Sequence, residues 1–226
     1  MVKIHNQGSY VSDLQIQKVI NLMPEQIRTL KVKIYITTTK GVFRQNKFKP
    51  RLEKKIRRFL EGESEAVFYY HEKTILLFED LLFEHCPKDF YWLFVYLLSH
   101  ELRHCEQGCF FKKRWNVVLG DYKDYLGEIN LYNLEELHWS EKDAYTYSYR
   151  FVVNHLSEIM DIFQLSTLHE FYPFNFDIDM QEIWESYKKE MDLLERIAWF
   201  IDDLYWRKPQ MSVLPNPITN SLKAQS

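Results

Sequence analysis

A run of apolar residues that ends in a polar motif constrains this chain more than any other feature. Every residue from Phe90 to Leu98 is aliphatic or aromatic, and the sequence continues as Ser99-His100-Glu101-Leu102-Arg103-His104. Asp89 before the run is a favoured helix N-cap, and Gly108 after it is a common stop signal. We therefore predict a largely buried helix from Asp89 to Gln107. The apolar run itself is only about half as long as the roughly 20 residues that span a bilayer.

Helical spacing gives the polar motif a chemical meaning. His100 and His104 are four residues apart, so their imidazole nitrogens lie on one helix face and can bind one metal ion. Glu101 sits about 100° around the helix from His100 and therefore flanks that ion. In catalytic zinc sites three protein ligands leave room for a water, and a neighbouring carboxylate accepts its proton. The motif thus predicts Zn²⁺, one per chain, on His100 and His104, with Glu101 as the general base.

The same residues carry a resemblance to a known family. Leu97 to His104 resembles the active-site helix of zincin metallopeptidases, in which HExxH supplies two zinc ligands and the catalytic base. Ala66 to Phe78 stands where compact zincins place an antiparallel strand pair at the edge of the cleft. Glu141-Lys142-Asp143-Ala144 is similar to the ExxA segment of the gluzincin branch, which implies Glu141 as the third zinc ligand. Tyr145 follows the alanine, where the family usually carries an Asp or Asn that supports the zinc site.

Spacing alone leaves the third ligand open, because Asp143, His138 and His155 belong to the same downstream region as Glu141. With Glu141 as the ligand, His138 and Tyr145 lie on the same helix face, and we expect either to stabilise the oxyanion. More distant alternatives for that role are Tyr147, Tyr149 and Arg150. Cys105 and Cys109 follow the motif, and we interpret them as buried thiols and not as further ligands.

The remaining sequence predicts an α+β fold, and the resemblance implies that it is zincin-like: a small N-terminal mixed sheet with the active-site helix, followed by a mainly helical C-terminal lobe. Helical spacing covers residues 11–23, 139–160 and 179–206, and strand patterns cover residues 31–38, 66–70 and 74–78. We expect one domain over residues 1–208, with an N-lobe to about 108 and a C-lobe over 109–208. Pro209, Pro215 and Pro217 mark a flexible tail over 209–226.

Charge and composition exclude some classes of partner. The 226 residues carry a net charge of −3, so no global field attracts nucleic acid or anionic lipid. Eight basic residues fall between Arg44 and Arg58, and we favour a solvated amphipathic helix over a nucleic-acid-binding face. Residues 1–10 lack the apolar stretch of a secretory signal, and three cysteines do not resemble a disulfide framework, so we expect a cytoplasmic location without a membrane partner.

These observations predict a zinc-dependent metallopeptidase that hydrolyses peptide bonds in a protein or peptide substrate, with Glu101 as general base. The alternative is a catalytically degenerate zincin-like module that binds a protein partner and regulates it. A third class, a protease linked to nucleic acid, rests on the basic cluster alone. The sequence does not indicate the substrate or the oligomeric state.

Overall fold

The computed structural model describes residues 1–62, 65–110, 139–166, 185–189, 191 and 196. The chain divides into two compact units, Met1–Glu190 and Met191–Ser226, and the fold below is that of the first unit. The helix predicted over residues 179–206 lies largely outside the described residues, and the tail predicted over 209–226 lies wholly outside them. None of the described helices has the length and apolar character that a membrane span needs.

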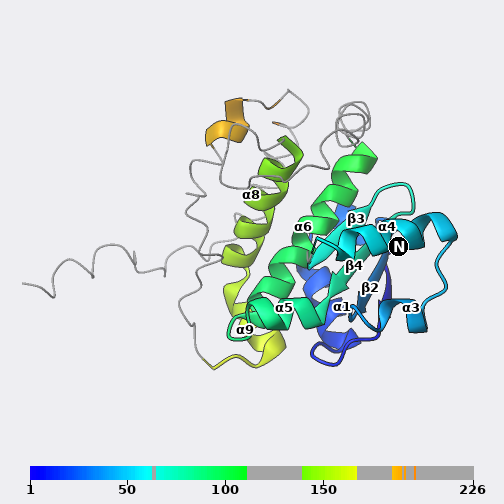
Figure 1. The fold of residues 1–226 in the computed structure, drawn as a ribbon. Coiled ribbons are helices and arrows are strands. Elements are labelled where there is room, and N and C mark those ends of the chain that lie inside the picture. Colours follow the sequence, from blue (N-terminus) through cyan, green and yellow to red (C-terminus); the bar gives the residue numbers. More distant parts are fainter. Residues whose placement is uncertain (63–64, 111–138, 167–184, 190, 192–195, 197–226) are drawn as a thin grey trace, which may run out of the picture. The chain divides into compact units, whose positions relative to one another are not determined.

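A four-stranded mixed sheet forms one layer of the fold (Figure 1). Its strands, in the order β1-β2-β4-β3, are β1 (Lys3–Asn6), β2 (Lys33–Thr37), β4 (Thr74–Phe78) and β3 (Ala66–Tyr69). β2 pairs in parallel with β1 and β4, whereas β3 pairs antiparallel with β4, so the predicted strand pair is confirmed as a hairpin. β1 was not predicted from the sequence. β3 lies at an edge of the sheet, which matters for the site described below.

The helices of this unit are α1 (Asp13–Leu22), α2 (Glu25–Arg28), α3 (Val42–Gln45), α4 (Pro50–Leu60), α5 (Glu79–His85), α6 (Phe90–Phe110), α8 (Trp139–Asn154) and α9 (Leu156–Phe163). α1 confirms the helix predicted over residues 11–23 and begins with a capping box between Ser12 and Gln15. Together with the sheet, these helices confirm the predicted α+β class.

β4 is the centre of the core, because all five of its residues are buried. Successive side chains of a strand point to opposite faces of the sheet. On one face Leu76 and Phe78 pack under Leu52 and Ile56 of α4. α6 packs against β3 and β4 and runs beside α8 (Figure 1). α6 therefore packs between the sheet and α8.

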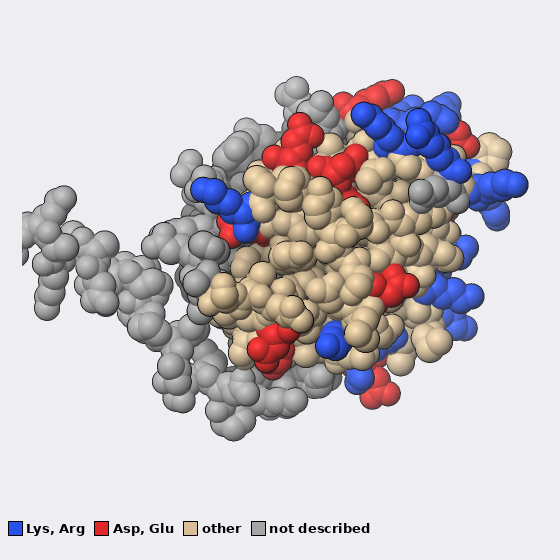
Figure 2. All heavy atoms as spheres, turned by 90° about the horizontal axis from the view of Figure 1, so that it is seen from below, with Lys and Arg blue, Asp and Glu red and all other residues tan. Residues whose placement is uncertain are grey.

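α4 confirms the predicted amphipathic helix. Its buried residues are Leu52 and Ile56, whereas most of its cationic side chains are exposed. Seen from below, Lys and Arg gather on the right-hand side, where Figure 1 places α3 and α4 (Figure 2). Arg57 pairs with Glu53 at 2.6 Å and lies over the ring of Phe43, so part of this charge is already engaged within the chain.

Two predicted helix boundaries are wrong. α6 continues through Gly108 to Phe110, because one glycine costs a helix only about 1 kcal/mol relative to alanine, less than the packing of its buried neighbours contributes. The single helix predicted over residues 139–160 is broken at His155, whose φ of −120° and ψ of 25° leave the helical region.

α5 was not predicted. The fold nevertheless presents the polar motif of α6 to α8.

Candidate metal centre

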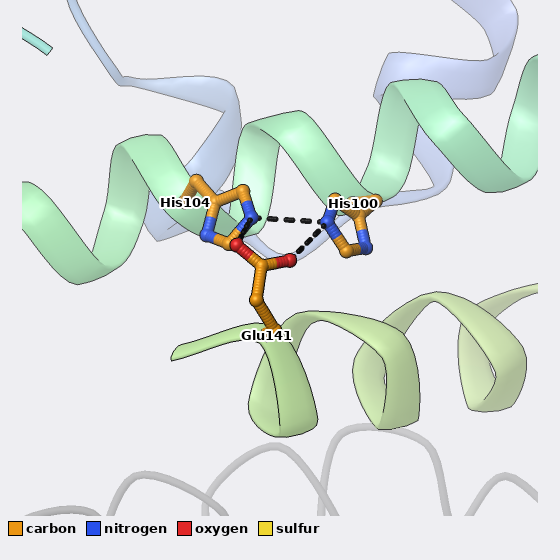
Figure 3. Close-up of side chains that lie close together, drawn as sticks. All are labelled: His100, His104 and Glu141. Carbon is orange, nitrogen blue, oxygen red and sulfur yellow. Dashed lines mark hydrogen bonds and ion pairs between the residues drawn. The ribbon is translucent and has the colours of Figure 1, made fainter. Parts of the chain in front are cut away.

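Helices α6 and α8 bring three potential metal ligands together (Figure 3). His100 and His104 project from one face of α6, and Glu141 projects from the first turn of α8 between them. The two Nε2 atoms are 3.0 Å apart. Glu141 Oε2 lies 3.2 Å from Nε2 of His100, and Oε1 lies 3.3 Å from Nε2 of His104. Three side chains from two helices therefore bring their potential ligand atoms within 4.8 Å of one another.

These separations fit a metal ion. In a tetrahedral zinc site with bonds of about 2.0 to 2.1 Å, neighbouring ligand atoms are roughly 3.3 Å apart. The side chains are only 6%, 8% and 15% exposed for His100, His104 and Glu141, so little water competes for them. Two imidazoles and one carboxylate are a donor set that leaves one coordination position open. The group is compatible with a buried metal site.

The electrostatics of the group are those of a cation site. Burial alone would raise the pKa of Glu141, but the charge of His104 and hydrogen bonds from both histidines hold it well below its usual range. Burial opposes the charge on His104, yet the Glu141 carboxylate raises the pKa of His104 to about 9. Burial and the neighbouring charge of His104 lower the pKa of His100. Without metal, one proton on His104 balances the carboxylate, and a bound cation would displace that proton.

Glu101 lies beside this group on α6 and touches the edge strand. The backbone N–H of Phe68 in β3 donates a hydrogen bond to the Glu101 carboxylate. Burial raises the pKa of Glu101 to about 7, and the Glu141 carboxylate adds to this, although His104 and the Phe68 hydrogen bond oppose it. A general base works best when its pKa is near the working pH. Glu101 is therefore suited to accepting and returning a proton near neutrality.

Buried hydrogen bonds through Gln107 fix the orientation of the His104 ring at Nδ1. Gln107 Oε1 lies 2.9 Å from Nδ1 of His104, while Gln107 Nε2 donates to Ser140 O at 2.9 Å and to Asp143 Oδ2. Because both acceptors face the amide nitrogen, the amide oxygen must face His104, so Nδ1 of His104 carries a proton. This directs Nε2 of His104 to the metal position, as a second hydrogen bond on a ligating histidine commonly does.

Asp143, one of the open candidates for the third ligand, is engaged elsewhere. Its carboxylate accepts two hydrogen bonds from Arg103, from Nε at 2.7 Å and from Nη2 at 2.9 Å. Arg103 also donates to Glu106 at 2.7 Å and lies over the ring of Tyr147. Arg103 and Asp143 thus form a buried pair that joins α6 to α8, next to the metal ligands but not among them.

Of the other predicted residues, Tyr145 lies at the site and His155 does not. Tyr145 lies at the site: its ring centroid is 4.6 Å from that of His100, and its pKa is raised by burial and by Glu141 and Glu101, so its hydroxyl keeps its proton. Nδ1 of His100 has no hydrogen-bond partner among the described residues. His155 lies at the break between α8 and α9, where it pairs with Glu158 and not with the three ligands. His138 lies outside the described residues.

Tyr147 is buried under Arg103, in agreement with core packing. Tyr149 and Arg150 are half-buried on α8 and do not belong to the three-ligand group. Sequence reasoning missed Gln107, Phe68 and the pair of Arg103 with Asp143. The sequence did contain a signal for the pair of Arg103 with Asp143, because these opposite charges lie inside HExxH and ExxA respectively.

Neither family models nor curated proteins nor solved structures contain a match to this chain.

Proposed function

We propose that this chain is a zinc metallopeptidase of zincin type, with zinc on His100, His104 and Glu141 and with Glu101 as general base. The observation that carries the proposal is the convergence of three side chains, whose nearest nitrogen and oxygen atoms are 3.0 to 3.3 Å apart, beside a carboxylate with a pKa of about 7. Two imidazoles, one carboxylate and an open position form the donor set of hydrolytic zinc enzymes. The HExxH motif on a buried helix after an antiparallel hairpin supports the same function.

The residues of the chain have distinct roles in this reaction. Zinc, when bound, supplies Lewis acidity to the attacking water and the scissile carbonyl. Glu101 accepts a proton as the water oxygen attacks the carbonyl carbon, and it then delivers that proton to the amine nitrogen as the C–N bond breaks. Tyr145 keeps its phenolic proton and is positioned to donate a hydrogen bond to the oxygen that becomes negative.

The edge strand β3 offers a place for an extended substrate. A peptide that lies along this strand forms main-chain hydrogen bonds, which recognise backbone and not sequence. The hydrogen bond from the N–H of Phe68 to Glu101 places this strand directly beside the general base. A substrate held on β3 would therefore bring its carbonyl close to the group that moves the proton.

Metal analysis tests the ligand set. We expect purified wild-type protein to retain about one zinc per chain, because three ligand atoms are preassembled. His100→Ala and Glu141→Ala are expected to lose that zinc, whereas His5→Ala, which removes a histidine on β1 that stacks on Tyr35, is expected to keep it. Retention of equimolar zinc by Glu141→Ala contradicts the proposed site.

A second experiment tests the reaction. Glu101→Gln preserves the size of the side chain but cannot accept a proton, so zinc should remain bound while peptide hydrolysis falls about 10²- to 10⁴-fold. Undiminished hydrolysis by the zinc-loaded variant contradicts the mechanism. The competing function, a zincin-like module that binds a protein partner, is motivated by Tyr145 at the position of the family's Asp or Asn. That function predicts a wild-type protein that binds zinc and a partner stoichiometrically without any turnover.

A further inference from the structure

A hollow of about 190 Å³ lies between the end of α6 and the turn that joins β3 to β4. The residues that line it come from both elements: Phe68, Tyr70, His71, Lys73, Cys105, Gly108 and Cys109. All of them belong to the described part of the chain, and apart from Phe68, whose backbone N–H contacts Glu101, none has been given a role in the reaction above. The hollow therefore needs an account of its own.

The α6 wall of the hollow continues the two stripes of residues that form the metal centre. Gly108 is four residues beyond His104, and Cys105 is four residues beyond Glu101, so each pair lies on one helix face. Four residues of helix advance about 6 Å along the axis. The hollow thus begins roughly one helical turn from the ligands and the general base, on the same side of α6.

The opposite wall is also shared with the metal centre. Phe68 donates its backbone N–H to Glu101 and is among the residues that line the hollow. Tyr70 lies two residues further along the chain and also lines the hollow. An extended peptide advances about 3.3 Å per residue. A substrate bound along β3 therefore brings a side chain about two residues from the scissile bond to the hollow.

The chemistry of the walls is apolar with a cation at the rim. Cys105 is buried, and its thiol offers a weakly polar surface. Phe68 and Tyr70 contribute aromatic rings, and Gly108 leaves space because it has no side chain. Lys73 is exposed and is among the residues that line the hollow. No carboxylate is among the residues that line the hollow.

We propose that this hollow is a subsite for an acidic side chain, glutamate in particular, of an extended peptide substrate. The methylene groups of the glutamate would pack against Phe68, Tyr70 and the thiols, and its carboxylate would reach Lys73. This inference rests on the metallopeptidase function proposed above and specifies its substrate class. It also gives Gly108, inside the helix where it is intrinsically unfavourable, a role in keeping the subsite open.

Short peptide hydroxamates test the subsite, because the hydroxamate anchors the peptide on zinc and binding is measured without turnover. Two series extend the peptide from the hydroxamate in the two chain directions, and each carries Glu, Gln, Ala or Lys at the two nearest positions. Affinities are measured by calorimetry on the zinc-loaded protein. We expect one series to bind at least tenfold more tightly with Glu than with Ala or Lys at one position.

Variants separate the subsite from general electrostatics. Lys73→Glu is expected to reverse the preference from Glu to Lys, whereas Lys54→Glu on α4 makes the same change in net charge and is expected to preserve it. Gly108→Leu fills the hollow with a good helix former, so the advantage of Glu should disappear while the Ala peptide keeps its affinity. Equal affinity for Glu, Ala and Lys in both series, or an equal effect of the two lysine variants, overturns the subsite. Failure of every hydroxamate to bind instead overturns the metal site and the subsite with it.

Discussion

The raised pKa of Glu101 predicts that this residue destabilises the metal-free protein above neutral pH. Below about pH 4.5 the carboxyl is protonated in both the folded and the unfolded chain. Between pH 4.5 and about 7 the unfolded chain releases the proton while the folded protein keeps it, so the free energy of unfolding falls as pH rises. A shift from 4.5 to about 7 corresponds to about 3 kcal/mol at roughly 1.4 kcal/mol per pKa unit. Glu101→Gln removes this cost, because the amide is neutral and its oxygen can still accept from Phe68.

Urea unfolding of the chelator-treated proteins measures this effect. The stability advantage of Glu101→Gln over wild type should grow by about 3 kcal/mol between pH 4.5 and pH 8 and then level off. Glu61→Gln, at an exposed glutamate that follows α4, should change stability by less than about 0.5 kcal/mol at every pH. Added zinc should shrink the advantage, because a nearby cation favours the ionised carboxylate. A difference between Glu101→Gln and wild type that does not vary with pH refutes the reasoning.

Three further predictions concern the surroundings of the site. Gln107→Leu removes the acceptor for Nδ1 of His104, a proposed zinc ligand, and competition with a chromogenic chelator should show zinc affinity about 10- to 100-fold lower, whereas Ser148→Ala on α8 should leave it unchanged. Asp143→Ala leaves the Arg103 charge buried without this partner, so denaturant unfolding should show a loss of about 3 to 5 kcal/mol. Ile56→Ala, in the core beneath α4, should lower stability by about 2 to 5 kcal/mol while the zinc content of the folded protein stays the same.

The part of the site that the sequence predicts well is the part that one helix determines. His100, Glu101 and His104 owe their relative positions to helical geometry, which depends only on their spacing. Glu141 is different, because which face of α8 meets α6 depends on packing between distant segments. Spacing left Asp143 open as the third ligand, and it was the zincin resemblance that selected Glu141. The structure turns Asp143, two residues or about 200° further around α8, toward Arg103.

The fold was predictable where hydrophobic periodicity was strong and was missed where the signal was tertiary. β4 and the helix carrying the motif stand out as apolar runs, and both were found. β1 has only four residues, none of them buried, and its parallel partner lies about thirty residues away. Nothing in its own sequence marks it as a strand. The helical stop expected at Gly108 was wrong because the buried packing of residues before the glycine, such as Cys105 and Gln107, outweighs its local preference.

Glu101, the proposed general base, also shows what spacing alone leaves out. The motif indicates that Glu101 lies near a metal, but it contains no information about the strand that contacts Glu101. The hydrogen bond from Phe68 and the burial that raises the pKa of Glu101 come from the hairpin packed against α6. Residue type and spacing therefore predict which group does the chemistry, whereas its readiness to exchange a proton near neutrality depends on the fold around it.

The division of the ligands between two helices makes metal affinity a measure of helix docking. When α8 is detached from α6, only two imidazoles remain, so the dissociation constant observed for the metal is the intrinsic value divided by the fraction of molecules in which α8 is docked. A substitution such as Phe151→Ala, in the buried face of α8 and ten residues after Glu141, would weaken metal binding through this fraction alone. A partner that undocks α8 from α6 would lower metal affinity and release the ion, whereas a partner that stabilises the docked state would raise metal affinity.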